Sequence, residues 1–462
     1  MHTFMHTTFV ANILHIFQIV NQYKKFLQDK MYYLCPKQKP MTLQRSDIEI
    51  MAPVGSYESL MAAIQAGANS VYFGIEMLNM RARSSNNFTT EDLANIVKIC
   101  NEHGIKSYLT VNTIIYDKDM ATLHKVMQAA KDNKVSAIIA CDIAAIQCAM
   151  EYGVEVHIST QLNISNTQAV KFFSQYADVV VLARELNLMQ VKEIYNAIQK
   201  EHICGPKGEL VKLEMFCHGA LCQAISGKCY LSLHENNYSA NKGACLQTCR
   251  KAYIVTEKET GNELEIDNEY IMSPKDLCTI GFLDELVEAG VRVMKIEGRA
   301  RSAEYVKTVV ECYNQAVEEI VNGTYNDNKD AKVAAWKERL SRVFNRGFWN
   351  GYYLGQRLGE WSRHYGSSAT KTKIAIGKCT NYFTNLNVAE FLMQSDELNQ
   401  GDEILITGPT TGVIEMTADD IRVDLKTVEK TVKGELFSMK TPEKIRRGDK
   451  LFKVVDSESI KK

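Results

Sequence analysis

The sequence lacks the short motifs that mark several common classes of enzyme. It has no HExxH, because His234 and Glu235 are followed by Asn, Asn and Tyr, and it has no GxSxG and no GKS or GKT phosphate loop. A metallopeptidase of the zincin type is therefore a poor fit. A cysteine peptidase would need a thiolate activated by a nearby base, and no sequence motif indicates such a pair.

The chain also lacks an excess of charge. Its 54 Lys and Arg residues nearly balance 55 Asp and Glu residues, which gives a net charge of −1 over 462 residues. Bulk charge therefore predicts no nucleic-acid partner, and any RNA-binding surface must be local. The length predicts two or three domains, and the hydrophobic content of 45% is that of an ordinary globular protein.

A long apolar run is absent from the N-terminal region. The run FVANILHIFQIV (9–20) is too short to span a bilayer, and its lysines follow it, whereas a signal peptide carries positive charge before the run. We therefore expect a cytoplasmic protein without a membrane segment. Residues 1–46 stand outside the pattern that follows, and we expect translation to start at Met41.

One unit repeats from residue 47: a helix, a glycine and a short apolar strand. Glycine just past a helix adopts a left-handed conformation that other residues resist, and short continuous apolar runs are typical of buried parallel strands. The predicted strands are 48–51, 70–73, 106–111, 137–140, 155–159, 179–182, 213–217 and 292–296. They predict an α/β protein with a (β/α)8 TIM-like barrel over 47–325. A doubly wound open sheet is the alternative, weakened because no GxGxxG follows the first strand.

Polar residues follow the ends of these strands, where barrel enzymes place their active sites. The candidate catalytic residues are His157, Gln161, Arg184, Glu297 and Arg299, and the candidate substrate-binding residues are Arg81, Arg83, Asn112, Ser159, His218 and Lys295. Alternate residues of a strand point into the barrel, so His157 and Ser159 are expected to share the mouth with Gln161. Each residue alone fits a solvated or capping role equally well; their convergence from several strands favours a site.

Cysteines cluster in a predicted insertion between strands seven and eight. Six of the 13 cysteines fall within 217–278, and none forms a CxxC pair, so a zinc ribbon is a poor fit. Clustered thiols without a secretion signal favour a metal or catalytic role over disulfides, and four thiolates on one insertion suit an iron–sulfur cluster. The alternative is buried, inert cysteines. A cluster on this insertion would lie over the barrel mouth, beside the polar strand ends.

The stretch EMFCHGALCQAISGKCYLS (214–232) closely resembles the signature of the peptidase U32 family, the collagenase-like proteases, as do residues 51–74 and 295–306. The resemblance implies a 4Fe–4S cluster held by Cys222, Cys229, Cys245 and Cys278, with Cys249 as competitor for the fourth place. It also implies hydroxylation of a tRNA wobble uridine to 5-hydroxyuridine, with prephenate as a small anionic co-substrate. The alternatives are hydroxylation of a ribosomal RNA cytidine, a peptidase, and a non-catalytic RNA-binding protein.

The region after the barrel divides in two. A connector (326–371) is basic and aromatic: residues 331–371 hold eight Lys/Arg against two Glu, interleaved with Phe344, Phe348, Trp349, Tyr352, Tyr353, Trp361 and Tyr365. This composition suits either stacking on unpaired bases or a helix and loop packed on the barrel. Short strands separated by Gly-Asp and Gly-Pro turns then predict a small all-β barrel over 372–457, similar to the C-terminal barrel of some family members.

Overall fold

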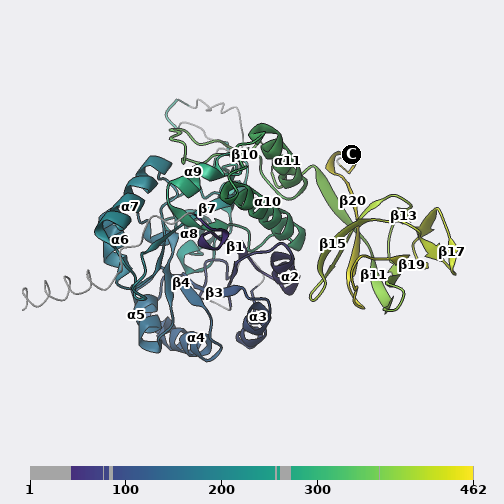
Figure 1. The fold of residues 1–462 in the computed structure, drawn as a ribbon, viewed down its shortest axis with the longest axis horizontal. Helices are drawn as coiled ribbons and strands as arrows, with labels where there is room; N and C mark the ends of the chain where they lie inside the picture. Colours follow the sequence, from purple (N-terminus) through teal and green to yellow (C-terminus); the bar gives the residue numbers. More distant parts are fainter. Residues whose placement is uncertain are drawn as a thin grey trace, which may run out of the picture.

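Eight parallel strands close into a barrel (Figure 1). The computed structural model describes residues 43–75, 78–82, 87–254, 258–260, 272–363 and 365–460. The barrel strands are β1 (Glu49–Pro53), β2 (Ser70–Phe73), β3 (Lys106–Val111), β4 (Ala137–Ala140), β5 (Val156–Ile158), β6 (Val179–Val181), β7 (Lys212–Ala220) and β9 (Val291–Ile296). Strand β9 pairs with both β7 and β1, which closes the ring. The predicted TIM-like fold is confirmed, and the open-sheet alternative is excluded.

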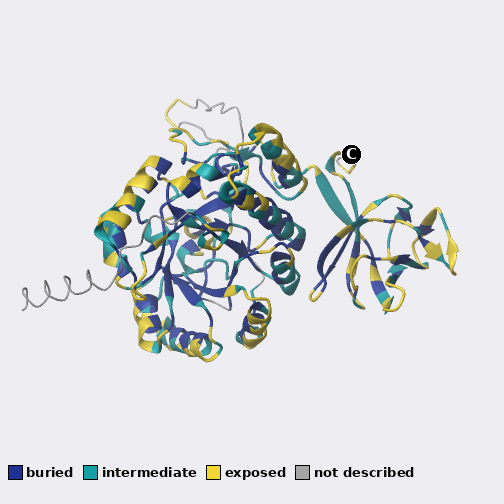
Figure 2. Ribbon diagram, viewed as in Figure 1, coloured by how far each residue is buried: buried dark blue, intermediate teal, exposed yellow. Residues whose placement is uncertain are grey.

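Helices cover the outside of the barrel and supply much of its buried surface (Figure 2). They are α2 (Tyr57–Gln65), α3 (Thr90–Glu102), α4 (Met120–Asp132), α5 (Ile143–Tyr152), α6 (Thr167–Ser174), α7 (Leu188–Glu201), α9 (Leu283–Glu288) and α10 (Ala303–Val321). Local chemistry sets their ends: the Thr89 hydroxyl accepts from the Asp92 amide at the start of α3, and Gly153, at φ +70°, ends α5. No helix in the described ranges has the length and apolarity needed to cross a membrane.

The insertion begins later than the sequence predicts. Strand β7 runs on to Ala220, and β8 (Asp276–Cys278) folds back on it antiparallel, with Cys278 opposite His218. Cys217 and Cys278, the predicted limits of the insertion, are therefore strand residues. The intervening chain forms α8 (Leu231–Asn236) and the short 3-10 turns η4 (Ala240–Lys242) and η5 (Thr248–Arg250). Further 3-10 turns are η1 (Arg45–Asp47), η2 (Asp117–Asp119), η3 (Thr160–Leu162) and η6 (Ser457–Ser459).

The basic and aromatic connector packs on the barrel. Helix α11 (Lys329–Arg342) buries Trp336 in the barrel core, and β10 (Phe348–Trp349) extends the sheet beside β8. The Tyr353 hydroxyl donates to the Phe216 carbonyl at 2.8 Å. Of the seven aromatic residues predicted as stacking candidates, only Tyr365 is exposed. The packed alternative is therefore correct, and base stacking by this segment as a whole is not supported.

The C-terminal region is all-β, as predicted. Its strands are β11 (Lys371–Phe383), β12 (Val388–Met393), β13 (Glu397–Asn399), β14 (Glu403–Gly408), β15 (Gly412–Thr417), β16 (Arg422–Val423), β17 (Lys426–Thr427), β18 (Lys430–Val432), β19 (Leu436–Lys440) and β20 (Lys450–Asp456). Eight of them form one sheet that runs from β15 to β17, and β13 pairs with β18. In the described residues the end strands β15 and β17 do not pair, so the strand pairings do not close a barrel.

The two domains share a small apolar contact. Ala62 of α2 and Ala303 of α10 pack with Leu405 and Val413 of the β domain. Gln65 adds two hydrogen bonds across the boundary: its Nε2 donates to the Thr411 carbonyl at 2.9 Å, and its Oε1 accepts from the Val413 amide at 3.0 Å. The β domain therefore docks on α2 and α10.

Candidate functional site at the barrel mouth

A cavity of about 200 Å³ opens at the C-terminal ends of the barrel strands. Its lining includes most of the predicted site residues: Arg81, Asn112, Ser159, Gln161, Arg184, Lys295, Glu297 and Arg299. The insertion forms one wall, because Leu221, Cys222, Ser226 and Cys245 line the same cavity. The polar strand ends and the cysteine insertion thus lie at one site. Arg83 falls outside the described residues.

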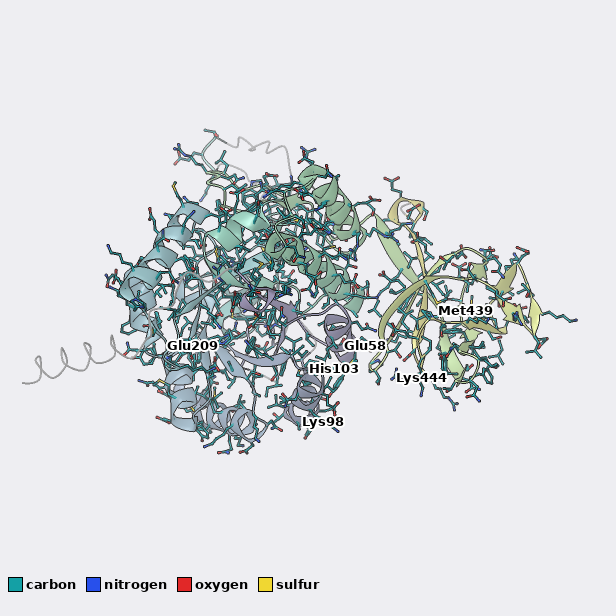
Figure 3. All side chains as sticks on the ribbon, viewed as in Figure 1. Glu58, Lys98, His103, Glu209, Met439 and Lys444 are labelled. Atoms are coloured by element: carbon teal, nitrogen blue, oxygen red, sulfur yellow. The ribbon has the colours of Figure 1, made fainter. Side chains whose placement is uncertain are left out.

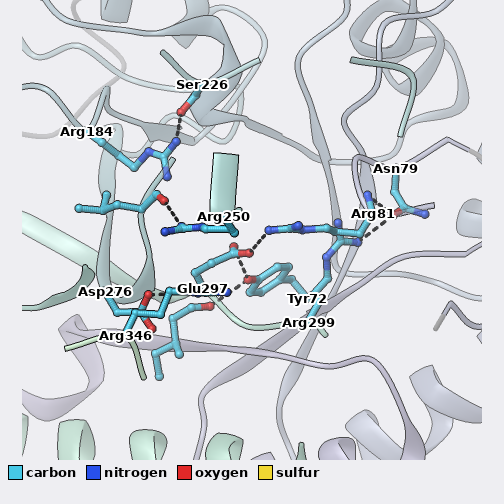
Figure 4. A network of polar contacts seen from close by, with 12 residues as sticks. Tyr72, Asn79, Arg81, Arg184, Ser226, Arg250, Asp276, Glu297, Arg299 and Arg346 are labelled. Carbon is cyan, nitrogen blue, oxygen red and sulfur yellow. Dashed lines mark hydrogen bonds and ion pairs between the residues drawn. The ribbon is translucent and has the colours of Figure 1, made fainter. Parts of the chain in front are cut away.

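The cavity carries an excess of positive charge. Six cationic side chains line it, Arg81, Arg184, Arg250, Lys295, Arg299 and Arg301, together with a single carboxylate, Glu297. Three of the six cations, Arg184, Arg250 and Arg299, are held by neutral groups (Figure 4). Arg184 donates to the Ser226 hydroxyl at 2.6 Å, and Arg250 donates to the carbonyls of Leu221 and Pro274, each at 2.6 Å. Their charges therefore stay available to an anionic ligand.

Arg299 shows the same arrangement at the floor of the cavity. Its Nη1 donates to the Thr110 hydroxyl at 2.8 Å and to the side-chain oxygen of Asn79 at 3.1 Å. Burial lowers the pKa of Arg299 to about 10. The guanidinium stays protonated at neutral pH, because that value is still well above 7. Gly74 is needed here, since a Cβ at that position would lie 2.7 Å from the Arg299 Nη1.

Glu297 fixes the position of Arg81. The Arg81 Nη2 lies 3.0 Å from the Glu297 Oε1, and the Tyr72 hydroxyl lies 3.3 Å from the Oε2. Burial alone would raise the pKa of Glu297, but the charges of Arg81 and Arg299 outweigh it and lower the pKa. The carboxylate is therefore ionised at neutral pH and orients a guanidinium at the mouth.

The charge of Lys295 is neutralised by a buried carboxylate inside the barrel. Its Nζ lies 2.7 Å from the Oε1 of Glu214, which is fully buried in β7. The ammonium also lies 4.8 Å from the ring centroid of Tyr72. Lys295 thus belongs to the cavity floor, but its charge is already paired, unlike those of Arg184 and Arg250.

Four cysteines of the insertion lie together. Cys222, Cys245 and Cys249 line the mouth cavity, and the charges of Cys222 and Cys245 act on Cys229. Burial raises the pKa of Cys249 to about 11, with Arg250 opposing the rise and Cys222, Cys245 and Cys229 adding to it. The described residues contain no group of three or more His, Cys, Asp or Glu side chains already arranged to hold a metal ion.

Cys278, predicted as a ligand, lies elsewhere. It is buried in β8, where its charge would act on the thiols of Cys217 on β7 and Cys312 on α10. The reason is the fold-back of β8 on β7, which carries Cys278 into the core rather than over the mouth. The competitor Cys249 takes the place beside the other three thiols. As a donor set, Cys222, Cys229, Cys245 and Cys249 fit the four thiolates of an iron–sulfur cluster.

His157 does not share the mouth, contrary to the prediction. Its ring lies lower in the barrel, 4.5 Å from that of Tyr108, and its Nε2 is 3.5 Å from the Glu155 Oε1. Burial would raise the pKa of Glu155, but hydrogen bonds from His157 and Lys207 lower it to about 2. Lys207 precedes β7, so this group belongs to the N-terminal end of the barrel. The alternation of side chains along β5 correctly predicts that His157 points into the barrel, but it does not predict how far His157 lies from the mouth.

His218, predicted to bind substrate, is also withdrawn from the cavity. It is buried among the rings of Tyr305, Tyr313 and Phe348, with centroid distances of 6.0, 5.5 and 5.7 Å. Burial lowers its pKa to about 3, so the imidazole is neutral at physiological pH. Its position in the core, away from the cavity, gives it a structural role.

Sequence reasoning missed three cavity residues. Tyr72 lies inside the barrel on β2, Arg250 lies within the insertion, and Arg301 follows Arg299 in the segment GRARS. Of the three, Arg301 is the residue that the sequence could have indicated, because it lies two positions after the predicted site residue Arg299 on the same loop. Arg250 lies on η5, which no strand-end pattern predicts.

The fold and the cavity define a (β/α)8-barrel protein with a cationic mouth beside clustered thiols. The chain belongs to peptidase family U32, because the sequence model of that family matches residues 55–363. A protein of Porphyromonas gingivalis named collagenase is 62% identical over 88% of this chain and 98% of its own length.

Two more distant relatives carry names that refer to RNA. The tRNA hydroxylation protein P1 of Bacillus subtilis is 32% identical over 78% of this chain and 83% of its own. A 23S rRNA 5-hydroxycytidine synthase of Escherichia coli is 33% identical over 61% of this chain and 41% of its own. The family thus includes proteins named as peptidases and proteins named for RNA hydroxylation.

Proposed function

We propose that this protein hydroxylates a pyrimidine in RNA, with a tRNA wobble uridine as its substrate and prephenate as its co-substrate. The observation that carries the proposal is the excess of uncompensated cations at the barrel mouth, beside four clustered thiols. The names of relatives over most of this chain support the RNA substrate. A wobble base is unpaired, so it can enter such a cavity at small unstacking cost. A ribosomal RNA cytidine is the alternative substrate.

Hydroxylation replaces a C–H bond of the base with a C–OH bond, which is a two-electron oxidation. It therefore needs a donor of the hydroxyl oxygen and an acceptor for two electrons. Prephenate, a dicarboxylate, is the co-substrate proposed to supply the oxygen, and an iron–sulfur cluster would pass the two electrons on to an external acceptor. Arg184, Arg250 and Arg299 would hold its carboxylates, because guanidinium groups bind carboxylates in a bidentate manner. Glu297 and Tyr72 would keep Arg81 in position against the same ligand.

The four thiols of Cys222, Cys229, Cys245 and Cys249 would hold an iron–sulfur cluster at the edge of this cavity. When bound, the cluster would supply or accept electrons next to the co-substrate. Arg81 and Arg250 are close enough to these cysteines for the charges to interact. The same two cations would therefore lie near both the cluster and the carboxylates of the co-substrate. Placement in the cytoplasm stays a prediction.

The peptidase alternative is favoured by the names of the relatives with the highest identity. The described cavity lining holds no histidine that could activate a thiol, since His157 and His218 both lie buried outside it. Its only carboxylate, Glu297, is ionised and paired with Arg81, and a second carboxylate for a proton-sharing pair is not among the lining residues. The described residues that line the mouth cavity therefore include no general base for cysteine or aspartic peptidase chemistry.

Nucleoside mass spectrometry of tRNA and ribosomal RNA from a deletion strain tests the proposal. We expect loss of 5-hydroxyuridine derivatives, restoration by the wild-type gene, and a fall of about 10-fold with Arg184→Ala, which removes one charge-assisted contact. The matched control is Lys125→Ala, an exposed cation on the outer helix α4, which should restore the modification fully. Unchanged 5-hydroxyuridine and 5-hydroxycytidine in the deletion strain would contradict the proposal and favour the peptidase.

A further inference from the structure

A second cavity adjoins the mouth. It measures about 570 Å³ and lies between the barrel and the β domain. The barrel contributes Ser56, Glu58 and the loop 299–304, and the β domain contributes Lys373 and Lys450. Residues 299–301 line both cavities, so the groove begins where the mouth ends. Glu58 marks the barrel side that faces the β domain (Figure 3).

Arg301 stands at the junction of the two cavities. Its guanidinium carbon lies 3.5 Å from the centroid of the Phe344 ring, and within the described residues it forms no hydrogen bond and no ion pair. Asp276, the carboxylate whose charge reaches it, is already paired with Arg346 at 3.3 Å. A guanidinium held flat on an aromatic ring keeps its donors in a fixed fork, which is a preorganised site for an anion.

The rest of the groove is also cationic on balance. Four cationic side chains, Arg299, Arg301, Lys373 and Lys450, face two carboxylates, Glu58 and Glu304. Lys373 is paired with Glu304 at 2.8 Å, whereas Lys450 is exposed and has no ion pair with any described residue. Arg301 and Lys450 are therefore the two groove cations whose side chains form neither a hydrogen bond nor an ion pair with the described residues, one at the inner end of the groove and one on the β domain.

The neighbouring cavity on the other side of Lys373 differs. It is lined by Arg339, Arg342 and Lys371, and each of these is bound to a carboxylate of Glu311 or Glu403 at 2.6, 2.6 and 3.6 Å. Its positive charges are compensated within the protein. Of these two cavities, the groove that leads out from the mouth past Arg301 is the one with cations that have no carboxylate partner among the described residues.

We propose that this interdomain groove binds the phosphodiester backbone of the RNA, with Arg301 on the phosphate next to the nucleotide whose base enters the mouth. The inference rests on the RNA substrate of the proposed function. The phosphate of a nucleotide is covalently tied to its base, so the shared loop 299–301 places both within one ligand. A free carboxylate ligand would be served by the mouth alone and would make no use of Lys450 on a second domain.

Binding of a fluorescein-labelled anticodon stem–loop to the full-length protein tests the groove. We expect Arg301→Ala to weaken binding about 10-fold and Lys450→Ala about 3-fold, each lowering the slope of log affinity against log salt by about one. Arg301→Lys should fall between, because it keeps the charge but loses the fork. Lys125→Ala, an exposed cation on α4 that lines neither the mouth cavity nor the groove, should bind like the wild type.

A second probe, with an uncharged methylphosphonate in place of the phosphate on the 3′ side of the wobble uridine, identifies the contact. If Arg301 binds that phosphate, Arg301→Ala should cause no further loss on the neutral probe, since the two changes remove the same interaction. Equal affinity and salt slope for wild type, Arg301→Ala and Lys450→Ala on the native probe would overturn the groove while leaving RNA as the substrate. Failure of the wild type to bind the stem–loop would overturn both proposals.

Discussion

His218 illustrates how burial decides the role of a residue that sequence alone marks as functional. Its Nδ1 lies 3.4 Å from the Tyr313 hydroxyl, and its Nε2 is buried without a hydrogen-bond partner in the described residues. An imidazolium there would be a buried, unpaired charge, which explains why the pKa falls to about 3. The residue supports the strand β7 from which the cavity wall departs, and it does so in the neutral form.

A pH dependence of stability follows from this histidine. Its folded pKa of about 3 lies below the value of about 6.5 in the unfolded chain, so the unfolded state binds the extra proton between these values. Its contribution is complete above about pH 6.5 and is lost as the pH falls, by at most about 1.4 kcal/mol per pH unit. His218→Phe should therefore flatten the fall in unfolding free energy, measured by urea denaturation at several pH values. The exposed His103, replaced by Gln, is the control; identical slopes for wild type and His218→Phe would contradict this view.

At the scale of elements, the bounds of β7 and β8 decide which cysteines lie on the insertion and which lie in the sheet. The fold-back of β8 separates Cys278 from the four thiols on the insertion. We expect Cys249→Ser to lose most of the iron and the visible absorbance after anaerobic reconstitution, whereas Cys278→Ser keeps both. Cys278→Ser should instead lower stability by about 1–3 kcal/mol, because a hydroxyl is smaller than the buried thiol it replaces and costs more to bury. Loss of iron in Cys278→Ser but not in Cys249→Ser would reverse the assignment.

The same elements show how far sequence can go. The ends of the eight barrel strands were predicted to within two residues, except that β7 ends three residues later, because a continuous apolar run bounded by glycine is a local signal. Strand β8 is three residues long and pairs antiparallel with a distant segment, so no local pattern separates Cys249 from Cys278. Likewise, alternation predicts that His157 points inward, but the stagger of strands in a barrel sets its depth. Arg250 and Arg301 were missed because loops place them.

At the scale of the whole molecule, the proposed RNA-binding groove requires the barrel and the β domain to hold one relative position, since the groove takes residues from both. The apolar contact around Ala62 and Val413 is small, so its polar contacts matter. Lys307 donates to the Val413 carbonyl at 3.1 Å. Gln65 forms hydrogen bonds with the Thr411 carbonyl and the Val413 amide, on either side of Gly412. Gly412 permits this approach: it has φ +71°, and a Cβ there would lie 2.4 Å from the Gln65 Oε1.

Gln65 gives a direct test of this docking. Its Oε1 accepts from the Val413 amide, so protection of that amide against hydrogen exchange reports the contact itself. Gln65→Ala removes the acceptor, and we expect Val413 to exchange roughly 3- to 10-fold faster, as for the loss of one hydrogen bond. Gln65→Glu is the matched control, because it keeps the acceptor while losing the donor to Thr411, and it should preserve the protection of Val413. Unchanged exchange in Gln65→Ala would mean that the apolar contact and Lys307 hold the domains without this bond.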